Sequence, residues 1–419
     1  MASSEQQKED LGLSARMSAK LAKLPPPAYL AIIPPPGLVR LEQAENTLLR
    51  PELVKICKNA INDELDEETF NYPKGFGGEP KLRDGLASFF NSYFEPSLKV
   101  EADHISVSAG SGNSFDALLH TICDDGDIVL TPGPFWSGFS IYSTLHASAT
   151  ILPSPAPSFR NSLTPDVITR LNETYTSHPT PSRIKALLIC NPHNPCDDTY
   201  SPAVLRQLMD FAHQHNLHYI SDEVSALCAF NTNPEKPFVS ALSLVRDGEG
   251  IRRSRVHVIW SASKDFGSAG VRTACVISQA NPSLLAGITY SSLWQVSILS
   301  SIYVTALLTS PELPNLISLN KSRLKSAYEY LTTRLDEWGV EYIPVKAGML
   351  IFVRIAKNAQ TFEEEAAVVG KLKESGVLVQ PGKMWGGIDG EKGWVRFSFA
   401  VKEEVMRDAL ERMGRVLGK

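Results

Sequence analysis

The sequence lacks the cysteine pattern of a disulfide-stabilised or secreted protein. It contains no C-x-x-C pair, and its six cysteines are scattered, most of them within apolar runs: Cys57, Cys123, Cys190, Cys196, Cys228 and Cys275. This pattern favours buried free thiols in a reducing compartment. The N-terminal stretch "MASSEQQKEDLGLSARMSAK" has no apolar core of the kind found in secretory signals. We therefore expect a cytoplasmic protein.

Long apolar runs and an excess of basic residues are also missing. No run approaches the ~18 residues that are needed to span a bilayer. The net charge is −5 and the pI is about 6.0. Charge therefore gives no reason to expect binding to nucleic acid or to an anionic membrane.

The composition that is present is that of an ordinary globular protein. Of the 419 residues, 43% are hydrophobic and 21% are charged. Proline clusters in "LPPPAYL" and "IIPPPGL" predict that residues 1 to about 36 form an extended arm. After the arm, short apolar runs alternate with helical patterns up to about residue 300. Strands of this kind, separated by helices, indicate a mostly parallel sheet that is covered on both faces.

The pattern changes after residue 300. "NLISLNKSRLKSAYEYLTTRLDEWG" predicts one long amphipathic helix. It is followed by expected strands at "VEYIPV", "GMLIFVRI", "GVLVQPG" and "GWVRFSFA", with a helix at "TFEEEAAVVGKLKESG" and another from about Lys402. We predict an N-terminal arm (1–46), a large domain (47–300) and a small α+β domain (301–419).

Polar side chains follow three of the expected strands at the point where each strand ends. "ALLIC" leads into "NPHNP", which contains Asn194, "HYI" leads into Asp222, and "VHVIW" leads into Ser261 and Lys264. Each has a structural alternative: a turn for "NPHNP", a helix cap for Asp222 and a surface amine for Lys264. Parallel sheets bind ligands at the carboxyl ends of their strands. The ordered set therefore favours a common binding crevice.

The stretch "VSAGSGNSFDALL" predicts a phosphate-binding turn. Here a strand enters a turn of small residues that opens a helix, so the amides of Ser111, Gly112 and Asn113 would face an anion. The stretch has neither the Walker lysine spacing nor the G-x-G-x-x-G fingerprint. Arg272, eight residues after Lys264, would supply a planar charged group for the same phosphate. Trp136 would either stack on a planar ligand or pack in the core.

Four motifs carry a family resemblance, and they occur in the family's order: "NPHNP", "SDEVS", "SASKDFGSAGVR" and "WVRFSFA". Over nearly its whole length the chain resembles the class I/II aminotransferases, which are pyridoxal-phosphate (PLP) enzymes of fold type I. It is most similar to the 1-aminocyclopropane-1-carboxylate synthase-like branch, because "GLVRLEQAENTLL" resembles that branch's motif. The resemblance implies a large domain with a mostly parallel sheet, a smaller α+β C-terminal domain, and a homodimer with shared active sites.

The resemblance also implies roles for individual residues. Lys264 would carry the cofactor covalently, and Asp222 would pair with its ring nitrogen. Asn194 would hydrogen bond to the ring hydroxyl and Trp136 would stack on the ring. The remaining contacts would be made by four residues that hold the phosphate (Ser111, Gly112, Ser261 and Arg272), by Arg396 on the substrate α-carboxylate, and by Glu45 facing the substrate. We expect burial and the charge of Arg272 to lower the pKa of Lys264.

The sequence departs from the family pattern at three points. Ser225 stands where the family usually has a tyrosine that donates to the ring hydroxyl, and Phe76 stands where a tyrosine reaches the partner subunit's phosphate. The glycine expected after "NPHNP" is replaced within "CDD". These departures favour a diverged branch with a specialised amino-acid substrate.

Three functions remain open on this basis. The first is a PLP-dependent lyase that cleaves a bond between Cβ or Cγ and a heteroatom such as sulfur, possibly in secondary metabolism. The second is an aminotransferase that passes an α-amino group to a 2-oxo acid, and the third is a non-catalytic binding protein. We expect no metal site at "HQHNLH", because its side chains lie where a helix ends and a strand begins.

Overall fold

The computed structural model describes residues 12–23, 37–231, 237–245, 250–385 and 388–419. Residues 1–36 form a compact unit of their own, in which helix α1 (Ala15–Leu21) is capped by the hydroxyl of Ser14. Most of the two proline clusters falls at residues 24–36, outside the described residues. All that follows concerns the second unit, Gly37–Lys419.

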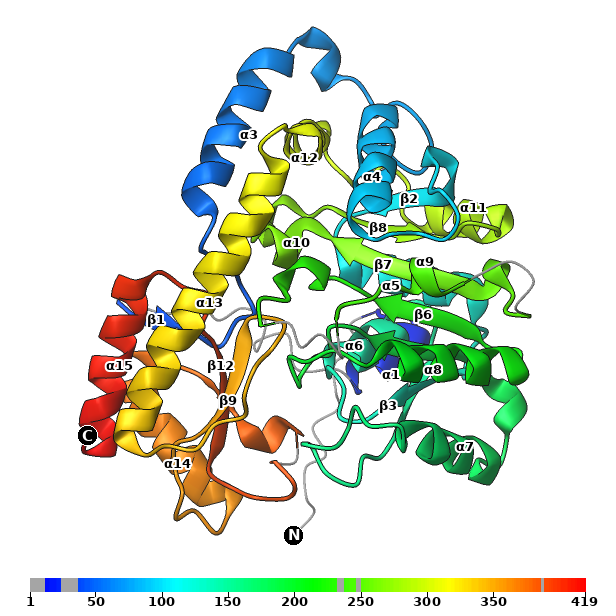
Figure 1. Cartoon of the computed structure of the whole chain (residues 1–419). Coiled ribbons are helices and arrows are strands. Elements are labelled where there is room, and N and C mark those ends of the chain that lie inside the picture. The colour runs from blue at the N-terminus through cyan, green and yellow to red at the C-terminus, as the bar shows by residue number, and fades with distance from the viewer. Residues whose placement is uncertain (1–11, 24–36, 232–236, 246–249, 386–387) are drawn as a thin grey trace. The chain divides into compact units, whose positions relative to one another are not determined.

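A seven-stranded sheet forms the centre of this unit (Figure 1). Its order is β2 (Ile105–Ser108), β8 (Ala274–Ile277), β7 (Val256–Ser261), β6 (His218–Asp222), β5 (Ile184–Cys190), β3 (Ile128–Pro132) and β4 (Thr150–Ser154). Only β8 runs antiparallel to its neighbours; all other pairs are parallel. The mostly parallel sheet predicted from the apolar runs is confirmed.

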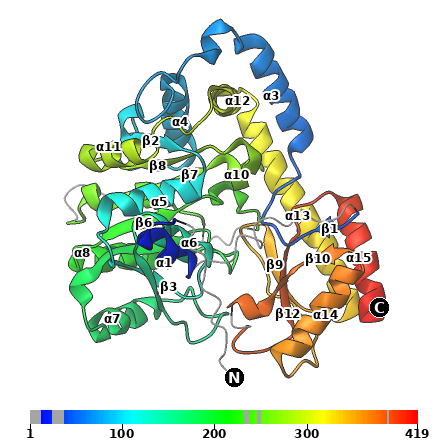
Figure 2. The same ribbon diagram turned by 180° about the vertical axis from the view of Figure 1, so that it is seen from behind.

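Helices cover both faces of this sheet. Alternate residues of β5 serve the two faces: Leu187 and Ile189 pack into one hydrophobic cluster, while Ala186 and Leu188 pack into another. The first face carries α4 (Pro80–Tyr93), α7 (Val167–Ser177), α8 (Pro202–Gln214), α9 (Ala241–Leu244) and α12 (Ile298–Thr309). The opposite face carries α5 (Ser111–Ile122), α6 (Gly138–Leu145) and α11 (Pro282–Ser291), with α5 in front in Figure 2.

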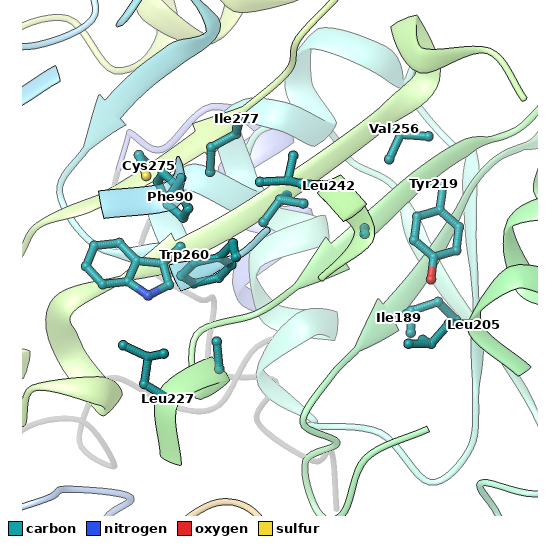
Figure 3. Packing of buried hydrophobic residues seen from close by; sticks show 14 of the residues in the cluster. Phe90, Ile189, Leu205, Tyr219, Leu227, Leu242, Val256, Trp260, Cys275 and Ile277 are labelled. Carbon is teal, nitrogen blue, oxygen red and sulfur yellow. The ribbon is translucent and has the colours of Figure 1, made fainter. Parts of the chain in front are cut away.

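The larger cluster fixes the strand that leads to the candidate site. Trp260 of β7 is fully buried, and its ring centroid lies 5.8 Å from that of Phe90 in α4. Figure 3 shows these two side chains near Cys275 and Ile277 of β8, with Tyr219 of β6 further along the same face. This packing holds β6 and β7 in register at the ends that bear Asp222 and Ser261.

A second, smaller set of strands lies toward the C-terminus. The antiparallel sheet has the order β11 (Gln380–Pro381), β12 (Trp394–Ser398) and β9 (Leu350–Arg354), and β1 (Val39–Arg40) pairs with β10 (Val377–Leu378). The helices that flank these strands are α13 (Leu313–Trp338), α14 (Phe362–Glu374) and α15 (Glu403–Leu417). The remaining helices of the unit are α3 (Arg50–Glu64) and the short α10 (Ala262–Asp265).

Most C-terminal predictions are confirmed, and two are wrong. The long helix is α13, and the strands at "GMLIFVRI" and "GWVRFSFA" are β9 and β12. "VEYIPV" is not a strand, because only Tyr342 bridges to Val353, and "GVLVQPG" divides into β10 and β11, which join different sheets. No helix among the described residues is long and apolar enough to cross a membrane. The division at residues 46 and 300 stays a prediction.

Candidate active site

The ends of three neighbouring strands bring the predicted residues together. β5, β6 and β7 are adjacent and parallel, so Asn194, Asp222 and Lys264 lie at the same edge of the sheet. Lys264 does not end the strand itself. It lies in the single turn α10, which begins after Ser261, and the Ser261 hydroxyl accepts a hydrogen bond from the Ser263 amide (3.4 Å). The structural alternative of a surface amine is therefore wrong for Lys264.

Asp222 presents an unpaired carboxylate oxygen at this edge. Its Oδ1 is buried without a hydrogen-bond partner among the described residues, and its Oδ2 lies 3.9 Å from the thiol of Cys190. Burial raises the pKa of Asp222 to about 7, against the effects of the Val224 amide, the Cys190 thiol and the Lys264 charge. A buried acceptor without a donor is costly. The carboxylate is therefore ready to receive an N–H group from a ligand.

The amine of Lys264 is held next to the N-terminal segment of the unit. Its Nζ donates a hydrogen bond to the backbone oxygen of Ala44. Burial lowers the pKa of Lys264, as expected. The nearby cation that also lowers it is Arg396, and not Arg272 as the sequence suggested. The lowered pKa makes a neutral, nucleophilic amine accessible near neutral pH.

The predicted phosphate site is assembled at the start of α5. Gly110 precedes the helix with φ +95°, and a side chain there would collide with the guanidinium of Arg272. Arg272 donates to the backbone oxygens of Ala109 and Ala269 at 3.1 and 2.8 Å. The amides of Ser111, Gly112 and Asn113 form the first turn of α5. Helix N-terminus and guanidinium together provide positive charge for an anion.

Arg396 is buried in β12 and faces the same edge. Its Nη1 donates to Oδ1 of Asn194 (2.8 Å), while Nε and Nη2 both donate to Oε1 of Gln380 (3.1 and 2.6 Å). The guanidinium also lies 4.0 Å from the ring centroid of Trp385. Burial lowers the pKa of Arg396 to about 10, so it remains charged at neutral pH.

The structure places two further predicted residues close to these groups. Glu45 pairs with Arg50 (2.9 Å) and lines a cavity of about 740 Å³, and its charge acts on Lys264. Trp136 packs edge to face on Phe139 (5.2 Å), and its indole covers Gly138. Core packing, the alternative for Trp136, therefore describes part of its surroundings.

The two positions that depart from the family pattern lie in different surroundings. Ser225 follows Asp222 closely and precedes a short helix, which its hydroxyl does not cap. Phe76 is 62% exposed and lies 6.4 Å from the ring of Tyr290 and 6.2 Å from that of Trp294. Both partner rings are exposed as well.

Sequence reasoning missed the groups that surround Arg396. Gln380 lies directly opposite Arg396 in the β11–β12 pair, and Trp385 follows in the next turn. Asp197 acts on Arg396 through its charge. The strand register that brings Gln380 to Arg396 has no counterpart in the sequence pattern, whereas the unusual aspartate in "CDD" was visible there.

These residues fit pyridoxal phosphate. The unpaired Oδ1 of Asp222 suits a pyridinium N–H, the amine of Lys264 suits an aldehyde, and the α5 N-terminus with Arg272 suits a phosphate. No group of three or more His, Cys, Asp or Glu side chains in the described part of the chain is arranged to hold a metal ion. Fold and site therefore define a PLP-dependent enzyme of fold type I.

Comparison with known proteins identifies the family. The family model "Aminotransferase class I and II" matches residues 37–413. The probable aminotransferase aclI of Aspergillus oryzae is 40% identical over 416 residues, which cover 97% of this chain and 98% of that protein. The probable aminotransferase gliI of Aspergillus fumigatus is 32% identical, with 91% and 89% covered. The chain belongs to the class I and II aminotransferase family.

More distant proteins agree with this assignment. A probable inactive 1-aminocyclopropane-1-carboxylate synthase-like protein of mouse is 27% identical over 92% of this chain and 67% of its own length. A Thermus thermophilus aspartate aminotransferase variant superposes with a TM-score of 0.76 at 22% identity, covering 97% of this chain and all of that one. The latter likeness concerns the fold alone.

Proposed function

We propose that the protein is a PLP-dependent lyase that removes a heteroatom substituent, such as sulfur, from Cβ or Cγ of an α-amino acid. The observation that carries the first part of this proposal is the buried amine of Lys264 at the same sheet edge as Asp222 and Arg396. An amine, an anion for a ring nitrogen and a guanidinium for a carboxylate are the groups that chemistry at an amino-acid Cα needs.

In this proposal the bound cofactor supplies an electron sink that stabilises negative charge at Cα. Asp222 holds a proton at the ring nitrogen. The Lys264 amine, whose pKa is lowered by burial, removes the proton from Cα as a general base. Departure of the Cβ or Cγ substituent with its bonding electrons then completes the elimination.

Arg396 orients the substrate by its α-carboxylate. Three of its N–H groups already donate to Gln380 and Asn194. One N–H therefore remains on each terminal nitrogen, which is the arrangement that receives a carboxylate through two hydrogen bonds. The stacked ring of Trp385 keeps the guanidinium plane in one orientation.

Ser225 supports elimination from a substrate larger than aspartate or alanine. Its short side chain takes the place of a tyrosine ring, and its hydroxyl caps no helix. Because serine is smaller, it leaves volume at the edge of the site that bears Asp222. This volume would accommodate a bulky leaving group.

A second function is favoured by the relatives. The A. oryzae and A. fumigatus proteins are named probable aminotransferases, and the same Lys264 amine would serve a transfer of the α-amino group to a 2-oxo acid. The two functions differ in where the proton removed from Cα is returned. Lys264 serves either path, and so the products distinguish them.

The experiment is to incubate the purified holoenzyme with single amino acids, including S-substituted cysteines. Elimination releases pyruvate or 2-oxobutyrate together with a thiol, without any added 2-oxo acid. Transamination converts the cofactor to its amine form and needs a 2-oxo acid for turnover. Arg396→Lys keeps the charge and loses the planar fork, so kcat/KM should fall by roughly 30- to 1000-fold, about 2–4 kcal/mol. An unchanged kcat/KM would refute the role of Arg396.

We also propose a homodimer in the cytoplasm. Three exposed aromatic side chains, Tyr72, Phe76 and Trp294, lie within 6.2 Å of one another in successive ring contacts, and Tyr290 adjoins them. Exposed apolar clusters of this kind mark protein interfaces. All six cysteines are free thiols, which supports a reducing compartment.

A further inference from the structure

Asp197 combines two unfavourable properties in the loop between β5 and α8. Its φ is +47°, a backbone conformation that favours glycine, although aspartate tolerates it better than most residues. Its side chain is buried, with 6% exposed. Backbone strain and a buried carboxylate both cost free energy, and strain of this kind gathers at functional sites. The residue therefore calls for a role.

Its contacts join the two sheets of the unit. The backbone oxygen of Asp197 accepts hydrogen bonds from the amides of Lys346 (3.1 Å) and Ala347 (3.0 Å), just before β9. Its carboxylate lies over Gly348, where any side chain would collide with it. The loop that bears Asn194 is thus fixed to the segment that leads into β9.

This position brings the carboxylate toward Arg396. The amides of Met349 and Leu350 and the charge of Arg396 all act on Asp197, and they oppose the effect of burial on its pKa, which is raised. Leu350 lies opposite Ser398, two residues from Arg396 on the same face of β12. The Oδ2 of Asp197 is buried and has no hydrogen-bond partner among the described residues.

The other titratable groups around Asp197 do not offer a positive charge. Burial raises the pKa of the Cys196 thiol to about 12, raises that of Cys190 and Cys228 as well, and lowers the pKa of His193 to about 3. All four are therefore neutral at pH 7. The neighbouring Asp198 pairs with Lys346 (3.5 Å). Within the described part of the chain, Arg396 is the cation that acts on Asp197.

We propose that Asp197 is a positioning residue: it is the counter-ion of Arg396 in the substrate-free enzyme, and it takes up a proton when an α-carboxylate binds Arg396. The second half of this proposal rests on the function proposed above. Two buried carboxylates compete for one guanidinium, and neutralising Asp197 relieves their repulsion. Burial already favours the neutral form of Asp197, so that proton uptake needs little further help.

The first half is tested by thermal unfolding of the holoenzyme in two backgrounds. At about pH 8.5, Asp197→Asn should lower the midpoint by roughly 2–4 °C when Arg396 is present, because it leaves a buried cation without its counter-ion. In an Arg396→Gln background the same change should raise the midpoint, because it removes an unpaired buried carboxylate. Asp198→Asn, whose partner is Lys346, is the matched control and should shift both backgrounds equally.

Asp197→Gly provides a second variant, because glycine suits φ +47° and folding is then not in doubt. Its shift should also differ between the two backgrounds, by the same amount as that of Asp197→Asn. Equal shifts in both backgrounds, for either variant, overturn the counter-ion role. This result does not depend on turnover, so a failure of the proposed lyase or transferase activity would leave it intact.

The second half is tested by adding L-alanine to the same holoenzymes. The ligand carboxylate should raise the midpoint of Asp197→Asn more than that of the wild type, because only the variant has an uncompensated Arg396. In the wild type the rise should be larger at about pH 5.5 than at pH 8.5, and in the variant this pH dependence should be lost. An equal rise in both proteins at both pH values, including no rise at all, overturns the coupling.

Discussion

Arg396 and Gln380 lie opposite each other on neighbouring strands, and two donors of the guanidinium converge on one amide oxygen. Nε and Nη2 of Arg396 lie 3.1 and 2.6 Å from Oε1 of Gln380. The amide occupies one edge of the guanidinium without adding a charge. Arg396 is thereby oriented before a substrate arrives while its full positive charge is kept.

The first prediction concerns this neutrality. Gln380→Glu should place a carboxylate against the same edge, which satisfies Arg396 and repels a substrate carboxylate. We expect KM for the amino acid to rise roughly ten- to a hundredfold, about 1.4–2.8 kcal/mol of binding, with a smaller change in kcat. Steady-state kinetics measure both constants. Gln214→Glu on the exposed end of α8 adds the same charge elsewhere and should leave KM unchanged; an equal effect of both variants would contradict the prediction.

The second prediction concerns the covalent attachment of the cofactor. Borohydride reduction of the holoenzyme should fix the cofactor to the peptide that carries Lys264, because this amine is buried next to Asp222 and has a lowered pKa. Lys264→Ala should lose the label and the visible absorbance. Lys402→Ala, which lines the cavity near Glu45, is the control and should keep both. Peptide mass spectrometry locates the label, and a label on any other lysine would rule out the assignment.

The sequence predicted the part of the site that lies at the ends of parallel strands. Apolar runs that stop at a polar residue mark both the strand and its carboxyl end, so Asn194, Asp222 and Lys264 were found together. The turn before α5 was found for the same reason, since small residues there permit the positive φ of Gly110.

The rest depended on pairing between distant segments. Gln380 meets Arg396 only because β11 and β12 adopt a particular register, and Asp197 meets Arg396 only because its loop contacts the start of β9. The strand β4 was missed because its exposed edge position leaves it with little apolar patterning. Conversely, "VEYIPV" has the alternation of a strand, but only Tyr342 finds a partner there.

The third prediction concerns the protonation of Asp222. Burial raises its pKa to about 7, so the folded apo-protein holds a proton that the unfolded chain releases near pH 4. Stability from this group is present at low pH and is lost as the pH rises toward 7. Asp222→Asn should therefore stabilise the apo-protein relative to wild type at pH 8, by an amount on the order of 4 kcal/mol, and not at pH 4.

Added pyridoxal phosphate should reverse this order. The ring nitrogen supplies the donor that Oδ1 of Asp222 lacks, so the cofactor should raise the thermal midpoint of the wild type more than that of Asp222→Asn. Thermal melts of both proteins at each pH, with and without cofactor, provide the measurement. A pH-independent difference between the apo-proteins would show that Asp222 is already charged at low pH.

The fourth prediction concerns the exposed aromatic cluster. Trp294→Ser should weaken self-association, because Trp294 contacts both Tyr72 (5.4 Å) and Phe76 (6.2 Å) at the surface. Light scattering over a concentration series should give a dimer for the wild type and a larger monomer fraction for the variant. Leu98→Ser removes another exposed apolar side chain outside the cluster and serves as the control. A wild-type protein that stays monomeric at micromolar concentration would refute the dimer.

The last prediction concerns Ser225. A tyrosine at this position should donate a hydrogen bond to the ring oxygen of the cofactor and stabilise its anion, as the family resemblance implies. Ser225→Tyr should therefore lower the pKa at which the visible absorbance of the lysine-bound cofactor titrates. The added ring should also fill the volume proposed for a bulky leaving group, so turnover of a large S-substituted cysteine should fall more than that of a small one. Ser225→Ala removes the hydroxyl, which caps no helix, and should change neither property. If Ser225→Tyr leaves the titration unshifted and slows large and small substrates equally, the side chain at 225 does not face the cofactor ring.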